Sequence, residues 1–397
     1  MKRSIPIALV IPVEQEYWRG VIAGIIKFAG TARPWLLSRF EANEADFERL
    51  ASMEAAGIIA AVKSPELAGR LRSLQTPCVN VSSVLAEADF PCVCVDDAGI
   101  GQLAASHFLQ RGMQNFAYVG MAQRGDFVRR CDAYVQRLKK ERIPQVAAHD
   151  AAEADSNQAR QALGRWLTSL PRPCAVFAAN DDLARRVIDA CREVPLHVPR
   201  DVAVLGCGDD SIVCGLATPK LSSVSLPAER VGYEAAALLE KLMAGKRRGL
   251  ESSVLPVSSV IGRASSDVVS VRDPSVAAAL RFILARAGEW IGVRELLLAM
   301  PIQRRSLERR FRQVLGRSPL EEIRRVRLEI ARELLATTDL PMPLVARRSG
   351  FSDGKQLSTV FRAEVGVTPT AYRAKFRIAG ATPADEGSSD DGPPADE

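Results

Sequence analysis

Long apolar runs are missing from this 397-residue chain. No uninterrupted run approaches the roughly 18 residues that a membrane-spanning helix needs. The first apolar stretch gives way to charge at Glu14, which is too early for a convincing signal peptide. We therefore expect a cytoplasmic protein that does not enter a membrane.

Motifs of catalysis and metal binding are missing as well. Neither Gly-x-x-x-x-Gly-Lys-Ser/Thr nor Gly-x-Gly-x-x-Gly occurs, so no phosphate-gripping loop is present. The eight cysteines all precede residue 215 and form no Cys-x-x-Cys pair, which favours reduced, mostly buried thiols. His107 has no Ser or Cys nucleophile at motif spacing and is interpreted as a packing residue. We expect no enzyme, no metal site and no cofactor.

Charge is abundant and unevenly distributed. Residues 275–378 carry 20 Lys and Arg against 10 Asp and Glu, and 18 of the 20 are Arg, whereas residues 379–397 carry six acidic residues and no basic one. A basic block of this kind indicates a polyanion partner, because the guanidinium fork suits phosphates and guanine edges. The alternative is an ordinary solvated helix bundle. The acidic tail, rich in Gly, Ser and Pro, is predicted to be disordered and to repel phosphates.

Two segments of the basic block repeat one helical pattern. In each, a Leu and a Phe stand four residues apart, Leu307 with Phe311 and Leu357 with Phe361, so they share one helix face, and a Gly closes the helix. Pro301 forces a break before the first of these helices. Two such helices predict a double helix-turn-helix that reads a bipartite DNA site. Residues 324–337 are expected to link the two units, with sites about one turn, roughly 34 Å, apart.

The exposed faces of these helices supply the candidate DNA contacts. Arg to guanine and Glu to cytosine are plausible pairings in the major groove, although contact with phosphates alone is the alternative for each arginine. The second helix has Gly in its first turn and is expected to read fewer bases. The candidates are Arg304, Arg305, Glu308, Arg309 and Arg312 in the first helix, and Gly354, Lys355, Ser358 and Thr359 in the second.

Residues 1–268 alternate short apolar runs with amphipathic stretches. Examples are Ile5–Ile11 followed by Tyr17–Phe28, and Cys174–Ala178 followed by Asp181–Arg192. This alternation predicts a doubly wound parallel α/β sheet, and the length favours two lobes with a cleft between them.

Specific motifs in both parts resemble known families. Residues 95–120, Asn180-Asp181 and residues 198–206 resemble the LacI/GalR-type periplasmic-binding-protein-like fold, without the helix-turn-helix that precedes it in those repressors. Gly350-Phe351 and residues 366–373, Gly-Val-Thr-Pro-Thr-Ala-Tyr-Arg, resemble the AraC/XylS family. The order of the two parts is similar to that of the xylose-operon regulators within that family.

The resemblance implies a division of the chain and a function. It implies a two-lobed sensor over residues 1–268, a linker over 269–275, an all-α DNA-binding domain over 276–378 and the tail over 379–397. The expected function is sequence-specific transcriptional regulation, as an activator, controlled by xylose or a related sugar. The expected partners are operator DNA, RNA polymerase and a second copy of the chain. The alternatives are a sugar-binding protein without gene control, a repressor, and a response to another ligand.

A sugar pocket needs carboxylates, amides and a planar cation for hydroxyls, and an aromatic ring for the apolar sugar face. For Asp181 the alternative is a helix cap, and for Arg130 a solvated charge. Gly208 and Trp18 stand where sugar-sensing relatives usually have polar residues, which leaves the ligand's identity open. The residues that the family pattern supplies are Tyr17, Arg19, Arg130, Asn180 and Asp181, and Asp209 is expected to replace the carboxylate missing at Gly208.

Overall fold

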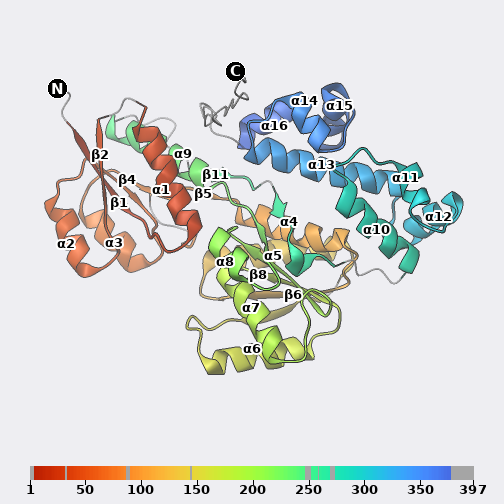
Figure 1. Cartoon of the computed structure of the whole chain (residues 1–397). Helices are drawn as coiled ribbons and strands as arrows, with labels where there is room; N and C mark the ends of the chain where they lie inside the picture. Colours follow the sequence, from red (N-terminus) through yellow and green to blue (C-terminus); the bar gives the residue numbers. More distant parts are fainter. Residues whose placement is uncertain are drawn as a thin grey trace, which may run out of the picture.

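The computed structural model describes residues 4–31, 34–85, 90–143, 145–245, 252–257, 259–268 and 273–376 (Figure 1). Most of the predicted linker and the whole acidic tail lie outside these residues. The described chain forms two α/β lobes followed by a helical region, residues 274–376. The predicted fold class is therefore confirmed.

The first lobe is built on a parallel sheet of order β2-β1-β3-β4. Its strands are almost continuously apolar, as expected for a sheet that is covered by helices on both faces. Helix α9 (Ala228–Met243) comes from far along the chain and packs against α1. The remaining elements of this lobe are β1 (Ile5–Val10), α1 (Glu16–Ala29), β2 (Trp35–Arg39), α2 (Glu44–Ser52), β3 (Gly57–Ala60), α3 (Pro65–Ser73) and β4 (Cys78–Asn80).

Two glycines permit the close contact between α1 and α9. A Cβ atom on Gly24 would lie 1.9 Å from the carbonyl oxygen of Glu229, and one on Gly232 would lie 1.8 Å from that of Val21. Real Cβ atoms do not come so close, so any larger residue would push the helices apart. The first lobe therefore depends on glycine at both positions.

The second lobe has a larger sheet of order β12-β10-β9-β8-β6-β7, parallel except for β12. A separate parallel pair, β5 (Val93–Val95) with β11 (Ser253–Leu255), lies beside the first lobe. The elements of the second lobe are α4 (Asp97–Gln110), β6 (Asn115–Gly120), α5 (Gly125–Lys140), β7 (Ala147–Asp150), α6 (Asn157–Ser169), β8 (Cys174–Ala178), α7 (Asp181–Glu193), β9 (Val202–Cys207), α8 (Ser211–Leu216), β10 (Ser222–Val224), β12 (Val260–Ile261) and the 3-10 turn Ala264–Ser266.

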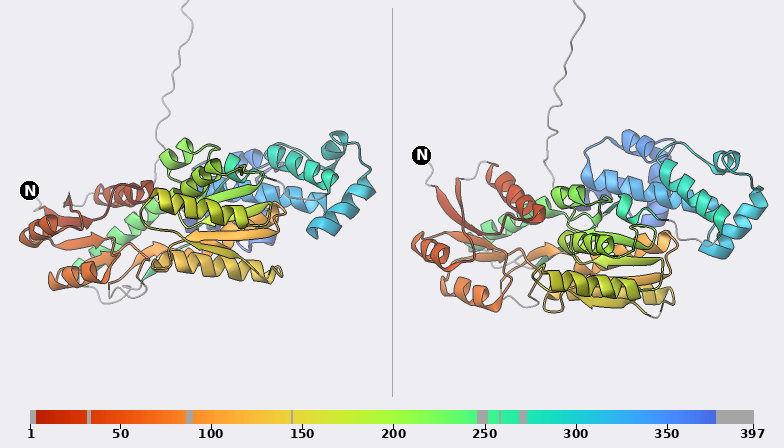
Figure 2. Two further views of the ribbon diagram at one scale, coloured as in Figure 1. Left: turned by 90° about the horizontal axis from the view of Figure 1, so that it is seen from below. Right: turned by 60° about the horizontal axis from the view of Figure 1, so that its bottom comes forward.

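The helical region consists of two small cores joined by one long helix, α13 (Pro319–Thr337). The sequence predicted this linking helix only from Arg324. It begins earlier because Ser318 and Glu321 form a capping box at its start. In Figures 1 and 2 the region lies alongside the second lobe. Its other helices are α10 (Pro274–Arg286), α11 (Val293–Leu298), α12 (Arg304–Leu315), α14 (Met342–Arg348), α15 (Gly354–Val365) and α16 (Pro369–Phe376).

Across the described residues, no helix is both long and apolar enough to cross a membrane. All eight cysteines are free thiols, and five of them are buried.

Candidate ligand cleft and nucleic-acid interface

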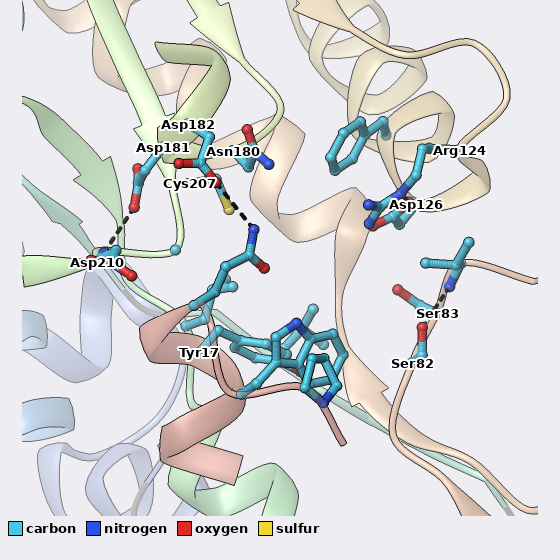
Figure 3. A pocket seen from close by; sticks show the side chains of 18 of the residues that line it. Tyr17, Ser82, Ser83, Arg124, Asp126, Asn180, Asp181, Asp182, Cys207 and Asp210 are labelled. Carbon is cyan, nitrogen blue, oxygen red and sulfur yellow. Dashed lines mark hydrogen bonds and ion pairs between the residues drawn. The ribbon is translucent and has the colours of Figure 1, made fainter. Parts of the chain in front are cut away.

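A cavity of about 380 Å³ lies between the two lobes. Its walls are the loops that follow strands β1, β3, β4, β6, β8 and β9, so the carboxyl ends of both sheets face it, as is usual for ligand sites in α/β sheets. Figure 3 shows Tyr17, Ser82 and Asn180 on different sides of the same space. We call this space the ligand cleft.

Arg130 on α5 supplies a fixed cation to the cleft. Its Nε donates to Asp97 Oδ1 at 2.9 Å and its Nη1 donates to the carbonyl oxygen of Ala179 at 2.7 Å. The guanidinium lies over the ring of Phe127, with 5.6 Å between its central carbon and the ring centroid. Within the described chain Nη2 donates no hydrogen bond, although the side chain is buried. The guanidinium is thus held rigidly with one nitrogen available to a ligand.

Asp181 forms part of the cleft wall, but its oxygens are already engaged. Oδ1 accepts from the Ser223 hydroxyl at 2.5 Å and Oδ2 accepts from the backbone N–H of Asp210 at 2.8 Å. Burial raises the pKa of Asp181 to about 7. The helix cap is Asn180, whose Oδ1 accepts from the N–H of Leu183 at 2.9 Å, so the alternative role of Asp181 as the cap is excluded. Within the part of the chain that the structure describes, the amide nitrogen of Asn180 donates no hydrogen bond, so it can donate to a ligand.

The first lobe contributes aromatic rings. Tyr17 and Trp18 both line the cleft and meet edge to face, with 4.8 Å between ring centroids. Lys63 places its ammonium 4.7 Å from the centroid of the Trp18 ring. Burial raises the pKa of the Tyr17 hydroxyl, which therefore remains protonated and can donate to a ligand. An apolar ring face beside a hydroxyl donor suits one face of a sugar.

Hydrogen bonds between the lobes close one side of the cleft. The backbone N–H of Glu16 donates to Asp210 Oδ2 at 2.8 Å, and the N–H of Ser211 donates back to Glu16 Oε2 at 2.5 Å. Gln15 Nε2 donates to Asp182 Oδ2 at 3.2 Å. These contacts can form only while the lobes are close together.

Two of the residues expected to bind ligand do not line the cleft. Arg19 Nη1 donates to the carbonyl oxygens of Val13 and Glu14, and its guanidinium lies 3.8 Å from Asp210. Asp209 points elsewhere and pairs with Arg263 at 2.8 Å. The geometry gives no support to ligand contacts by Arg19 or Asp209. It adds Lys63, Ser82 and Asp182, whose positions just after strand ends are the only sequence signal for them.

The pair His107 and Ser266 has the appearance of a hydrolase dyad but lacks its chemistry. His107 Nε2, on α4, lies 2.8 Å from Ser266 Oγ, and both residues are buried. Burial and the nearby Arg111 lower the pKa of His107. A hydrolase would orient this His with a carboxylate, but here the cation Arg111 contacts His107 Nδ1 through its Nη1 at 3.1 Å. The structure thus agrees with a packing role. No group of three or more His, Cys, Asp or Glu converges within the described ranges.

In the helical region, α12 presents a charged outer face. Leu307 and Phe311 are fully buried as expected, and Gly316 closes the helix at φ 69°. On the opposite face, Arg304 Nε donates to Glu308 Oε1 at 2.9 Å, which orients the carboxylate. The residues that share one open groove on this face are Arg305, Glu308, Arg309, Arg312 and Gln313.

Helix α15 repeats this arrangement with weaker charge. Leu357 and Phe361 are fully buried, and Gly366 closes the helix at φ 82°. Asp353 caps its start by accepting from the N–H of Gln356 at 2.8 Å. The outer residues are the partly exposed Gly354 and the exposed Lys355, Ser358 and Thr359. This helix offers fewer charged groups to DNA than α12.

Two family models match the chain. A periplasmic binding protein-like domain matches residues 105–266, and a helix-turn-helix domain matches residues 297–375. The first covers most of the second lobe, and the second covers α12 to α15 in full. The two matches therefore fall on the two regions that hold the cleft and the candidate DNA contacts.

Similar proteins extend over nearly the whole chain. The xylose operon regulatory protein of Haemophilus influenzae is 27% identical over 379 residues, 92% of this chain and 97% of that protein. The protein of the same name from Escherichia coli K12 is 28% identical and covers 92% of this chain and 96% of that protein. A solved structure of a xylose-binding transcription activator has a TM-score of 0.62 at 25% identity, covering 94% of this chain and 98% of that one.

Proposed function

Because this chain belongs to the AraC-type regulators of the xylose-operon kind, with a periplasmic-binding-protein-like sensor, we propose that a sugar bound between its lobes controls its binding to operator DNA. It is a DNA-binding transcriptional regulator and not an enzyme. One observation carries the proposal: a single chain holds a polar cleft with aromatic walls and two Arg- or Lys-bearing recognition helices.

The proposed effector is xylose or a closely related neutral sugar. Arg130 Nη2, the Asn180 amide and the Tyr17 hydroxyl supply donors, while the carboxylates of Asp182 and Asp210 supply acceptors for sugar hydroxyls. The cleft lining includes five acidic residues (Glu14, Asp126, Asp181, Asp182 and Asp210) but only three basic ones (Lys63, Arg124 and Arg130). This charge balance favours a neutral sugar over a sugar acid.

The proposed DNA mode places α12 and α15 in two successive major grooves, with α13 setting their separation. Arg305, Glu308 and Arg309 are the proposed base-reading residues, with Arg304 and Arg312 at their sides. In the second unit Lys355 contacts phosphate, and Ser358 and Thr359 face the bases beside Gly354. We further propose that the protein acts as a dimer and activates transcription by contact with RNA polymerase.

A thermal-shift screen of the purified chain tests the effector. D-xylose, other pentoses, hexoses and sugar acids are compared at millimolar concentration. A sugar at about 100 times its dissociation constant stabilises the folded state by roughly 2.7 kcal/mol, which moves the melting transition clearly. A shift with D-xylose alone supports the proposal, and a shift only with sugar acids contradicts the preference for a neutral sugar.

Selection of bound duplexes from a random-sequence pool tests the DNA mode. Two conserved half-sites about 10 base pairs apart are expected, and the first should carry the stronger consensus. A single half-site, or no consensus at all, would contradict the proposed use of both helices.

A further inference from the structure

The turn that follows β9, residues 208–210, directs two neighbouring carboxylates to different parts of the molecule. Gly208 has φ 133° and Asp209 has φ 54°, both in the left-handed region, and an L side chain rarely adopts this conformation. Three bonds hold the turn: the N–H of Gly208 donates to the carbonyl of Val224, that of Asp209 to Ser223 Oγ, and that of Asp210 to Asp181 Oδ2. As a result, the neighbouring carboxylates of Asp209 and Asp210 diverge.

Asp210 is the carboxylate of this turn that lines the ligand cleft. Its carboxylate lines the cavity and accepts the N–H of Glu16 from the first lobe at 2.8 Å. Its other oxygen caps α8 by accepting from the N–H of Ile212 at 3.1 Å. Movement of the first lobe, or a ligand hydroxyl that competes for this carboxylate, therefore acts directly on the turn.

Asp209, by contrast, does not line the ligand cleft. Its Oδ1 accepts from Arg263 Nη2 at 2.8 Å. Arg263 is anchored in turn, because its Nη1 donates to the carbonyl of Leu221 at 2.9 Å and its backbone N–H donates to Ser222 Oγ at 2.8 Å. The guanidinium is thus fixed at the edge of the second lobe.

Arg263 faces the linking helix of the DNA-binding region. A cavity of about 830 Å³ separates the second lobe from the helical region, and Arg263 lines it from one side while Glu329, Arg332 and Glu333 of α13 line it from the other. Burial, helped by the negative charge of Asp209, raises the pKa of Glu333, and the positive charge of Arg263 lowers it. A cation of the second lobe and a carboxylate of α13 therefore line the same cavity.

We propose that Arg263 is the positioning residue that couples the ligand cleft to α13. The route runs from Asp181 and Asp210 through the turn at Asp209 to Arg263, and from there to Glu333. This inference rests on the proposed function, because it specifies how occupation of that same cleft reaches the DNA-binding helices. If it is correct, a substitution at Asp181 changes the amide exchange of α13 only while Arg263 is present.

Hydrogen–deuterium exchange of the full-length protein tests this without ligand or DNA. Amide exchange over residues 319–337 is compared in the wild type, Asp181→Asn, Arg263→Gln and the double variant. Asp181→Asn should speed exchange in α13 about fivefold or more in the wild-type background, a factor at the low end of measured couplings, and less than about twofold in the Arg263→Gln background. Asp126→Asn is the matched control, because it changes another buried carboxylate of the cleft that is paired with Arg124 and lies off the route.

Equal effects of Asp181→Asn in the two backgrounds would overturn the proposal, since Arg263 would then be a structural residue only. If Asp181→Asn does not fold, Ser223→Ala removes the same link and is judged by the same criterion.

An exchange experiment with added D-xylose tests this coupling and the identity of the effector separately. Protection of α13 in the wild type but not in Arg263→Gln supports both. If D-xylose does not protect residues 180–182 and 208–210 in the wild type, D-xylose is not the effector. The comparison of the variants still decides the role of Arg263.

Discussion

The carboxylate of Asp181, in the wall of the ligand cleft, accepts a hydrogen bond from the hydroxyl of Ser223 at 2.5 Å. Asp181 is 4% exposed, and desolvation outweighs its two hydrogen bonds, so its pKa rises to about 7. The unfolded chain releases this proton near pH 4, whereas the folded chain holds it until about pH 7. Asp181 is therefore a buried acid whose charge changes near neutrality.

Stability is expected to depend on pH through this residue. Between about pH 4 and pH 7 the folded state binds more protons than the unfolded state, so the contribution of Asp181 is largest at low pH and is lost as pH rises through 7. The free energy of unfolding of the wild type relative to Asp181→Asn should fall by up to about 4 kcal/mol over this range. Urea unfolding of both proteins at several pH values measures it. A difference that does not change with pH would show that Asp181 is already ionised.

Tyr17→Phe is expected to weaken sugar binding without unfolding the protein. The substitution removes only the hydroxyl and keeps the edge-to-face contact with Trp18. Loss of one hydrogen bond should raise the dissociation constant for the sugar found in the screen by about threefold to tenfold. Calorimetric titration measures it, with Tyr233→Phe, whose ring packs on Phe28 away from the cleft, as the control. An equal loss of sugar affinity in both variants would show that the Tyr17 hydroxyl does not bind the sugar.

Gly232→Ala should destabilise the first lobe by several kcal/mol. The added methyl group would lie 1.8 Å from the Val21 carbonyl, and no flexible side chain can yield there, because the obstacle is backbone. Gly69→Ala is the matched control: it lies in α3 with nothing within 4 Å, and it should stabilise by up to about 1 kcal/mol through helix propensity. Thermal unfolding of the two variants should therefore shift in opposite directions.

Arg309→Ala should weaken operator binding, while Arg310→Ala should not. Arg309 is exposed on the outer face of α12, whereas Arg310 is tied to Asp273 by a 2.9 Å ion pair. Loss of a base contact should cost about 1–3 kcal/mol and relax specificity at one position. Loss of a phosphate contact should instead lower the salt dependence of binding equally on all sequences. Titrations at several salt concentrations, on selected and random duplexes, distinguish these outcomes.

Local sequence determined the elements and their caps. The run Cys174–Ala178 and residues 5–10 of the run Ile5–Ile11 form strands as predicted, because continuous apolar segments suit a sheet covered on both faces. The four-residue spacing of Leu307 and Phe311 placed both side chains in the core of the first helix-turn-helix. Strand β2 was not foreseen, and the start of α13 was misplaced, because a short strand and a capping box carry little periodic signal.

Tertiary structure decided which polar residues meet. Asp209 and Asp210 are neighbours with the same chemistry, and only the left-handed turn sends one to the ligand cleft and the other to Arg263, 54 residues away along the chain. The sequence likewise could not assign the cap to Asn180 and leave Asp181 to Ser223. Helical periodicity and helix caps depend on residues within one helical turn of each other, so the sequence alone determines them. The partners of a buried carboxylate depend on where strands distant in the chain bring their ends together, and only the fold specifies this.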